Sequence, residues 1–135
     1  MIQARYLMRR WSYVRENATA REIIFKFMAN AYPGLPVVKN NREVVGIVTE
    51  FDILSVIQKG RDLDSVNAGE IMSRKTVTAG LDTSQEELIK IMLENNFTII
   101  PILKDNRLAG IVSRMEIMNA QVDPDLYKHI EETEK

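Results

Sequence analysis

The sequence predicts an α/β (α+β) protein built from two similar repeats, each with the element order β-α-β-β-α. Two observations lead to this prediction. The halves of the 135-residue chain match at an offset of about 64 residues, and each half has a helical hydrophobic pattern followed by two short β-rich runs. With 45% hydrophobic residues, the chain can form one compact module but not two large independent domains.

The match between the halves covers almost the whole chain. The segment LPVVKNNREVVGIVTEFDIL at residues 35–54 aligns with IPILKDNRLAGIVSRMEIM at residues 100–118, with a one-residue gap in the turn. Further upstream, TAREIIFKFM aligns with TSQEELIKIM, and ARYLMRR aligns with AGEIMSR. We therefore expect four regions: a first repeat at 2–58, a polar linker at 59–66, a second repeat at 67–122 and a polar C-terminal tail at 123–135.

Each repeat is expected to contain a first amphipathic helix that begins after a threonine. In the first repeat, one helical face carries the apolar residues Ala20, Ile23, Ile24, Phe27 and Met28. Thr19 with Glu22, and Thr83 with Glu86, have the spacing of a capping box at the start of this helix.

Two short strands follow that helix in each repeat. The runs LPVV and VVGIV flank a polar turn at 40–42, and the runs IIPIL and LAGIV flank a polar turn at 105–107. A second helix then opens at Thr49 in the first repeat and at Ser113 in the second. One repeat of about 60 residues leaves a sheet face bare. The two repeats are therefore expected to pack sheet to sheet about a pseudo-two-fold axis, with clefts where they meet.

The charge and residue usage exclude several classes of function. Lysine and arginine number 18 against 19 acidic residues, so the chain lacks the positive excess typical of nucleic-acid binding. There is no cysteine, which excludes disulfides, thiolate metal sites and a cysteine nucleophile, and which fits a cytoplasmic location. No apolar stretch approaches the roughly 20 residues of a membrane span, so no membrane partner is expected.

The segment after the second strand of each repeat carries the candidate chemistry. It reads GIVTEFD, ending at Asp52, and GIVSRME, ending at Glu116. One interpretation is structural, because Thr49 with Asp52 and Ser113 with Glu116 have capping-box spacing, which stabilises a helix start by about 1 kcal/mol. The other is functional, because a helix N-terminus with a hydroxyl attracts phosphate, and an acid can bind both hydroxyls of a ribose. The two interpretations are compatible.

The order of these motifs, found twice, resembles the CBS domain family, whose members occur as tandem pairs. The resemblance covers roughly residues 2–122 and rests on the openings LMR and IMS, the proline strands LPVV and IPIL, and the two Gly-Ile-Val-hydroxyl-x-x-acid motifs. It implies that an adenosine nucleotide (AMP, ADP, ATP) or the related S-adenosylmethionine lies in the cleft between the repeats. It also implies that the pairs form a homodimer shaped as a flat disc.

The resemblance further implies roles for individual residues. Asp52 is expected to hold the ribose, and the hydroxyl of Thr49 or Ser113 is expected near the ribose or phosphate. The adenine is expected in an apolar slot, for which the candidate residues are Tyr13 or Val77, together with Leu35 and Pro36 or Ile100 and Pro101.

Two positions depart from the family pattern. Glu116 replaces an aspartate, and its extra methylene moves the carboxylate by about 1.5 Å, roughly one bond, so this second site is expected to be altered or empty. The residues before Pro36 and Pro101 are apolar rather than basic, so phosphate contacts must come from elsewhere. Arg114 is the preferred candidate, because it follows Ser113 and its guanidinium suits a phosphate in forked geometry. The alternative is a solvated arginine at an exposed helix start.

Three functions remain open on the sequence. The favoured one is a regulatory module that binds an adenosine nucleotide and signals to an effector protein by conformational change. The second is a structural or protein-interaction CBS pair without a nucleotide. The third, an enzyme, is disfavoured because there is no nucleophile paired with a base, and the only histidine, His129, has no partner at metal-ligand spacing. We therefore expect no catalytic residue, no metal site and no required cofactor.

Overall fold

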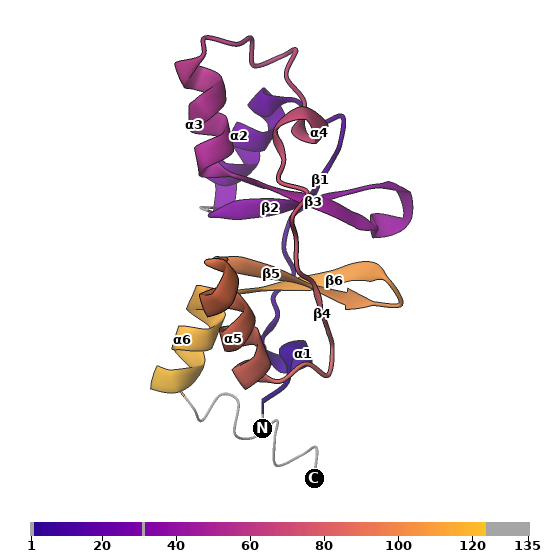
Figure 1. Cartoon of the computed structure of the whole chain (residues 1–135), viewed down its shortest axis with the longest axis vertical. Helices are drawn as coiled ribbons and strands as arrows, with labels where there is room; N and C mark the ends of the chain where they lie inside the picture. The colour runs from indigo at the N-terminus through magenta and orange to yellow at the C-terminus, as the bar shows by residue number, and fades with distance from the viewer. Residues whose placement is uncertain (1, 31, 124–135) are drawn as a thin grey trace. The chain divides into compact units, whose positions relative to one another are not determined.

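The computed structural model describes residues 2–30 and 32–123, and the remainder of the expected tail, with His129, lies outside the described residues. The described chain divides into two compact units (Figure 1). The first unit comprises residues 11–76, and the second unit comprises residues 2–10 with 77–123. Each unit has a three-stranded sheet and its own hydrophobic core, so the α+β class and the presence of two repeats are confirmed.

Each sheet combines a parallel and an antiparallel strand pair, in the orders β1-β2-β3 and β4-β5-β6. The central strand of each sheet carries the proline motif, and a polar turn connects it to the third strand. The six strands are β1 (Val14–Arg15), β2 (Gly34–Val38), β3 (Val44–Thr49), β4 (Ala79–Gly80), β5 (Ile99–Lys104) and β6 (Arg107–Ser113).

Two long helices and one short helix pack against the core in each unit. Figure 1 shows α2 beside α3 in the first unit and α5 beside α6 in the second. The buried residues of α2 and α5 follow helical spacing, because Ile23 and Phe27, like Leu88 and Met92, lie four positions apart. The helices are α1 (Ala4–Leu7), α2 (Ala20–Asn30), α3 (Glu50–Gln58), α4 (Ala68–Ile71), α5 (Gln85–Asn95) and α6 (Arg114–Val122), with a 3-10 turn, η1, at Asn40–Arg42.

The two units exchange the segments that open the two sequence repeats. Helix α1 belongs to the second unit, where Ala4 is fully buried, and α4 belongs to the first unit. The backbone of Arg9 pairs with that of Ile111 through N–O distances of 2.9 and 3.0 Å. Ser73 pairs with Ile47 in the same way, at 2.8 and 3.0 Å. Each third strand therefore gains a backbone partner from a segment that lies far away in the sequence.

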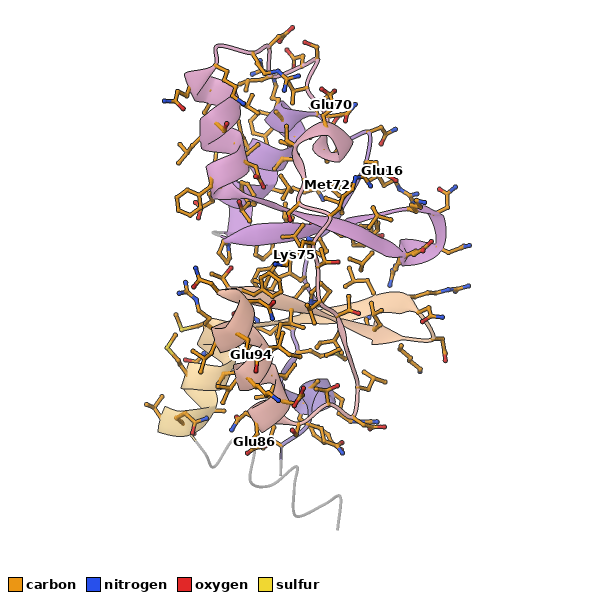
Figure 2. The ribbon with its side chains drawn as sticks, viewed as in Figure 1. Glu16, Glu70, Met72, Lys75, Glu86 and Glu94 are labelled. Atoms are coloured by element: carbon orange, nitrogen blue, oxygen red, sulfur yellow. The ribbon has the colours of Figure 1, made fainter. Side chains whose placement is uncertain are left out.

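The glycine of each Gly-Ile-Val motif makes room for a methionine from the exchanged segment. A Cβ atom at Gly46 would lie 2.5 Å from Sδ of Met72 and 2.9 Å from the carbonyl oxygen of Ser73. A Cβ atom at Gly110 would lie 2.9 Å from Sδ of Met8. Figure 2 shows Met72 beside the sheet of the first unit. The motif glycine is thus required for the packing of the exchanged segment.

The start of α5 differs from the sequence prediction by one residue. Helix α5 begins after Ser84, whose hydroxyl accepts a hydrogen bond from the backbone N–H of Glu87 at 3.2 Å. The predicted capping box of Thr83 with Glu86 is therefore wrong. The Thr83 hydroxyl instead accepts from the backbone N–H of Gly80 at 3.0 Å, because it belongs to the turn before the helix.

This one-residue shift also includes β4, the strand before α5. In the first unit, Val14 of β1 lies opposite Val37, the residue after the strand proline. In the second unit, Ala79 rather than Thr78 lies opposite Ile102, the residue after the second proline. Structural equivalence therefore runs one residue ahead of the sequence alignment from β4 to the end of α5, whereas in β5 the sequence alignment already pairs Pro36 with Pro101 as the structure does.

The segment predicted as the linker packs against the first unit. The carbonyl oxygens of Leu63 and Val66 accept hydrogen bonds from the backbone N–H groups of Arg21 and Ala20, at 3.1 and 2.9 Å. Val66 is 2% exposed and joins the first core. The Arg21 guanidinium donates to both carboxylate oxygens of Asp64, at 2.7 and 3.2 Å, and these hydrogen bonds lower the pKa of Asp64.

We predict that Gly46→Ala lowers the free energy of unfolding by about 1–3 kcal/mol, because the added methyl group overlaps Met72 and the Ser73 backbone. Gly80→Ala is the matched control, since its Cβ would meet nothing closer than the Thr83 hydroxyl at 3.9 Å. Urea denaturation of both variants measures the difference. Equal stability of Gly46→Ala and the unmodified protein would contradict this packing role.

Candidate functional site

The Thr49–Asp52 pair lies where β3 ends and α3 begins. Thr49 is the N-cap residue of α3, and its backbone N–H donates to Oδ2 of Asp52 at 2.7 Å. The Thr49 hydroxyl lies 3.1 Å from the same oxygen and donates to it. Both side chains are half-buried. Among the described residues, Oδ1 of Asp52 receives no hydrogen bond, so this oxygen is available to a ligand.

The Ser113–Glu116 pair occupies the equivalent place at the start of α6, with a different geometry. The backbone N–H of Ser113 donates to Oε1 of Glu116 at 3.0 Å, and the Ser113 hydroxyl donates to Oε2 at 2.7 Å. The Ser113 hydroxyl also accepts from the N–H of Met115 at 3.2 Å. Glu116 is only 3% exposed. Both of its oxygens are therefore used within the protein.

The extra methylene of Glu116 explains the difference between the two caps. The longer side chain can present one oxygen to the N–H and the other to the hydroxyl of Ser113, whereas Asp52 meets both Thr49 donors with a single oxygen. From the sequence, this substitution predicts only that the second site is altered or empty. In the structure, the Glu116 carboxylate is turned inward and buried, in contrast to the half-buried Asp52 carboxylate.

The proline strands begin next to these caps. Gly34, the first residue of β2, lies opposite Thr49 in the register of the sheet. The side chains of the next residues, Leu35 and Pro36, are fully buried, and Leu35 belongs to the first core. Their counterparts Ile100 and Pro101 are also buried, and Ile100 belongs to the second core. These residues build the strands beside the caps, and their part in an adenine slot stays a prediction.

Tyr13 and Val77 occupy different structural positions. Tyr13 is half-buried directly before β1, and the Arg42 guanidinium lies 5.6 Å from its ring centroid in a cation–π arrangement. Val77 is half-buried two residues before β4. Because β4 is shifted by one residue, the structural counterpart of Tyr13 is Thr78 and that of Val77 is Ser12.

Arg114 is the first residue of α6 and has an exposed side chain. Its backbone N–H donates to the carbonyl oxygen of Thr98 at 3.1 Å. Its guanidinium makes no hydrogen bond or ion pair with any described residue. The structure therefore leaves open both interpretations of Arg114, a phosphate ligand and a solvated arginine.

An aromatic pair that sequence reasoning missed lies beside the start of β2. The indole N–H of Trp11 donates to the carbonyl oxygen of Gly34 at 3.1 Å, and the Trp11 ring stacks on Tyr32 with centroids 4.4 Å apart. In the sequence, the one sign of this pair is that Tyr32 lies two residues before Gly34, at the start of the proline strand. Trp11 and Tyr32 both pack against the first core.

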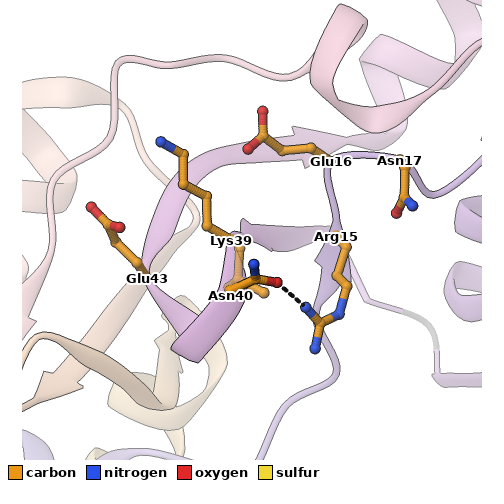
Figure 3. Close-up of a pocket in the computed structure, with 7 residues that line it drawn as sticks. Arg15, Glu16, Asn17, Lys39, Asn40 and Glu43 are labelled. Carbon is orange, nitrogen blue, oxygen red and sulfur yellow. Dashed lines mark hydrogen bonds between the residues drawn. The ribbon is translucent and has the colours of Figure 1, made fainter.

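Two surface hollows lie away from these caps. The hollow in Figure 3, of about 410 Å³, is lined partly by Arg15, Lys39 and Glu43, and Arg15 donates to the Asn40 side chain at 3.1 Å. A hollow of about 570 Å³ in the second unit includes residues of the second polar turn. Both hollows are at the turn end of the strands, so neither contains a predicted site residue.

Residues 2–30 and 32–123 lack two kinds of feature. Within these ranges, no helix has the length and apolar character needed to span a membrane. No group of three or more histidine, cysteine, aspartate or glutamate side chains in the same ranges is arranged to hold a metal ion.

Comparison with known proteins identifies the family. The sequence model of the CBS domain family matches residues 5–59 and 68–123. The chain therefore belongs to the CBS domain family, and it contains two such domains in tandem.

Relatives share this module within longer chains. Protein MK0525 of Methanopyrus kandleri is 35% identical over 119 residues, which are 87% of this chain and 60% of that protein. Inosine-5'-monophosphate dehydrogenase of Methanocaldococcus jannaschii is 30% identical over 112 residues, which are 82% of this chain and 22% of the enzyme. The chain thus spans less than two thirds of the length of either relative.

Solved structures share the fold. CBSX2 in complex with AMP superposes with a TM-score of 0.80 and 20% sequence identity, covering 93% of this chain and 99% of that one. Protein MJ1225 of Methanocaldococcus jannaschii superposes with a TM-score of 0.81 and 23% identity, covering 91% of this chain and 51% of that one. At these identities, the likeness establishes the fold alone.

We predict that Glu116→Ala costs more stability than Asp52→Ala. Removal of Glu116 leaves a buried gap and an unpaired hydroxyl, for which we expect a loss of about 2–3 kcal/mol. Removal of the half-buried Asp52 costs about 1 kcal/mol, as expected for a helix cap. Chemical denaturation measures both, and the reverse order would contradict the assigned geometries.

Proposed function

We propose that this CBS pair is a regulatory module that binds an adenosine nucleotide beside Thr49 and Asp52. The ligand is AMP, ADP, ATP or the related S-adenosylmethionine. Binding shifts the conformation of the module, which acts on an effector protein in the cytoplasm. The module needs no cofactor and catalyses no reaction.

The observation that carries this proposal is the unequal use of the two Asp52 oxygens. The Thr49 hydrogen bonds fix the carboxylate through Oδ2, and Oδ1 is left with no donor among the described residues. A charged acceptor that is already oriented and half-buried can bind the adjacent hydroxyls of a ribose with little loss of side-chain entropy. The first turn of α3 adds the unpaired N–H groups of a helix start.

Glu116 gives a reason to expect one nucleotide rather than two. Its oxygens already accept hydrogen bonds from Ser113, and burial keeps them from solvent. A ribose at this position would have to break those bonds and leave buried donors unpaired, which costs about 1–3 kcal/mol for each group. The AMP bound to CBSX2, a protein of the same fold, supports a ligand of this class.

We predict that Asp52→Asn weakens nucleotide binding by about 1.5–3 kcal/mol, because the charge-assisted hydrogen bonds to the ribose are lost. Isothermal titration with AMP, ADP, ATP and S-adenosylmethionine measures the affinity, and thermal unfolding detects ligand stabilisation. Glu116→Gln is the matched control and should bind as the unmodified protein does.

Two results would count against the nucleotide proposal. The absence of heat and of thermal stabilisation with every ligand at millimolar concentration would refute it. Equal affinity in Asp52→Asn and the unmodified protein would instead refute the assignment of the ribose to Asp52.

Exposed apolar residues on the second long helix of each unit favour a second candidate function, protein interaction. On α3, Phe51 is 81% exposed, and Leu54 and Ile57 are more than half exposed. On α6, the exposed apolar residues are Met115, Met118 and Val122. Residues spaced three or four apart share one helical face, and such faces mark binding surfaces. The occupant that we propose is a second copy of this chain, forming a homodimer.

We predict that Phe51→Ser combined with Leu54→Ser converts the dimer to a monomer, because the apolar face of α3 is removed. Light scattering coupled to size-exclusion chromatography measures the mass. Gln58→Ser, an exposed position on the same helix, is the control and should leave the dimer intact. A monomeric unmodified protein at high micromolar concentration would refute the homodimer.

A further inference from the structure

Lys26 has an environment unlike that of the other cationic side chains. Among the described lysine and arginine residues, Lys26 alone is half-buried, and all the others are exposed. Its ammonium group donates to the Ser12 hydroxyl at 2.8 Å. Within the described chain, it has no carboxylate partner. An ammonium group carries three donors, so a neutral hydroxyl satisfies only part of its hydrogen-bonding capacity.

The second unit shows that this position does not require a charge. With the one-residue shift, the structural counterpart of Lys26 on α5 is Ile91, just as Phe27 corresponds to Met92. The counterpart of Ser12 is Val77. The second unit therefore forms the same fold with apolar residues at the two positions where the first unit has the hydrogen-bonded Lys26 and Ser12. Partial burial of an ammonium is costly without an anion, which indicates a role other than packing.

A continuous series of contacts connects Lys26 with the Asp52 cap. Ser12, the partner of Lys26, is followed by Tyr13 and preceded by Trp11, whose indole N–H donates to the Gly34 carbonyl. Gly34 lies opposite Thr49 in the sheet, and Thr49 holds Asp52. These groups lie at the starts of β1 and β2 and the end of β3.

The dimensions of this end of the first unit suit a mononucleotide. The strand order is β1-β2-β3, so the Ser12 side of the sheet and the Thr49 side are two strand spacings apart, about 10 Å. The Trp11–Tyr32 stack, which is only partly buried, lies beside the start of β2, the middle strand. A cation at one side and an acceptor for hydroxyls at the other are separated by a span that the phosphate and ribose of one mononucleotide can bridge.

We infer that Lys26, oriented by Ser12, binds the phosphate of a nucleotide whose ribose is held by Asp52. This inference rests on the proposed nucleotide site and assigns its phosphate contact to the first unit. Lys26 thereby makes the site select a nucleotide over the corresponding nucleoside. The second unit has Ile91 and Val77 in place of this pair and lacks the same contact.

The test compares the binding of AMP and adenosine to the unmodified protein and to Lys26→Met. The methionine side chain has similar length and favours the helix. We expect the unmodified protein to bind AMP more tightly than adenosine. In Lys26→Met, AMP affinity should fall at least about tenfold, and adenosine affinity should stay the same, which also shows that the site is folded. Lys90→Met, a change of an exposed lysine on α5, is the control for general charge effects and should preserve the preference for AMP.

The outcomes separate this inference from the nucleotide proposal. If the unmodified protein binds neither AMP nor adenosine, both are overturned. If it binds AMP and Lys26→Met keeps the same preference over adenosine, the role of Lys26 is overturned and the nucleotide site stands. If Lys90→Met loses the preference as strongly as Lys26→Met, the effect is general electrostatics, and the Lys26 contact is likewise overturned.

Discussion

The proposed site depends on one interaction, the hydrogen bonds by which Thr49 holds a single oxygen of Asp52 at the start of α3. At Asp52 the short side chain meets both Thr49 donors with one oxygen and leaves the other without a donor, whereas the longer Glu116 commits both oxygens to Ser113. One methylene therefore separates an available carboxylate from one used for folding.

The position of these caps depends in turn on the exchanged opening segments. Arg9 and Ser73, which follow α1 and α4, provide backbone partners to the third strand of the other repeat, and Met8 and Met72 occupy the space left by the motif glycines. The strand that carries each glycine ends at its cap residue, Thr49 or Ser113. The motif glycine and the cap residue therefore lie on the same strand.

Much of the fold follows from the sequence, because the internal repeat, the helical spacing and the turn residues all indicate the same elements. The exchange of the opening segments does not follow from the sequence. ARYLMRR and AGEIMSR match each other equally well whether each segment packs in its own repeat or in the other one. The one-residue shift was also hidden, because adjacent Thr83 and Ser84 both suit a helix cap. It matters for the site, since the sequence alignment pairs Lys26 with Lys90, whereas the structure pairs it with Ile91. The contrast between Lys26 and its apolar counterpart emerges only after this correction.

The most direct test of ribose binding by Asp52 is a crystal structure of this protein, from crystals grown with saturating AMP. We predict one nucleotide, with its ribose hydroxyls on Oδ1 of Asp52 and with the Thr49 and Ser113 hydrogen bonds unchanged. A ribose bound to Glu116 in place of Asp52, or a well-ordered Asp52 with no nucleotide beside it, would contradict it.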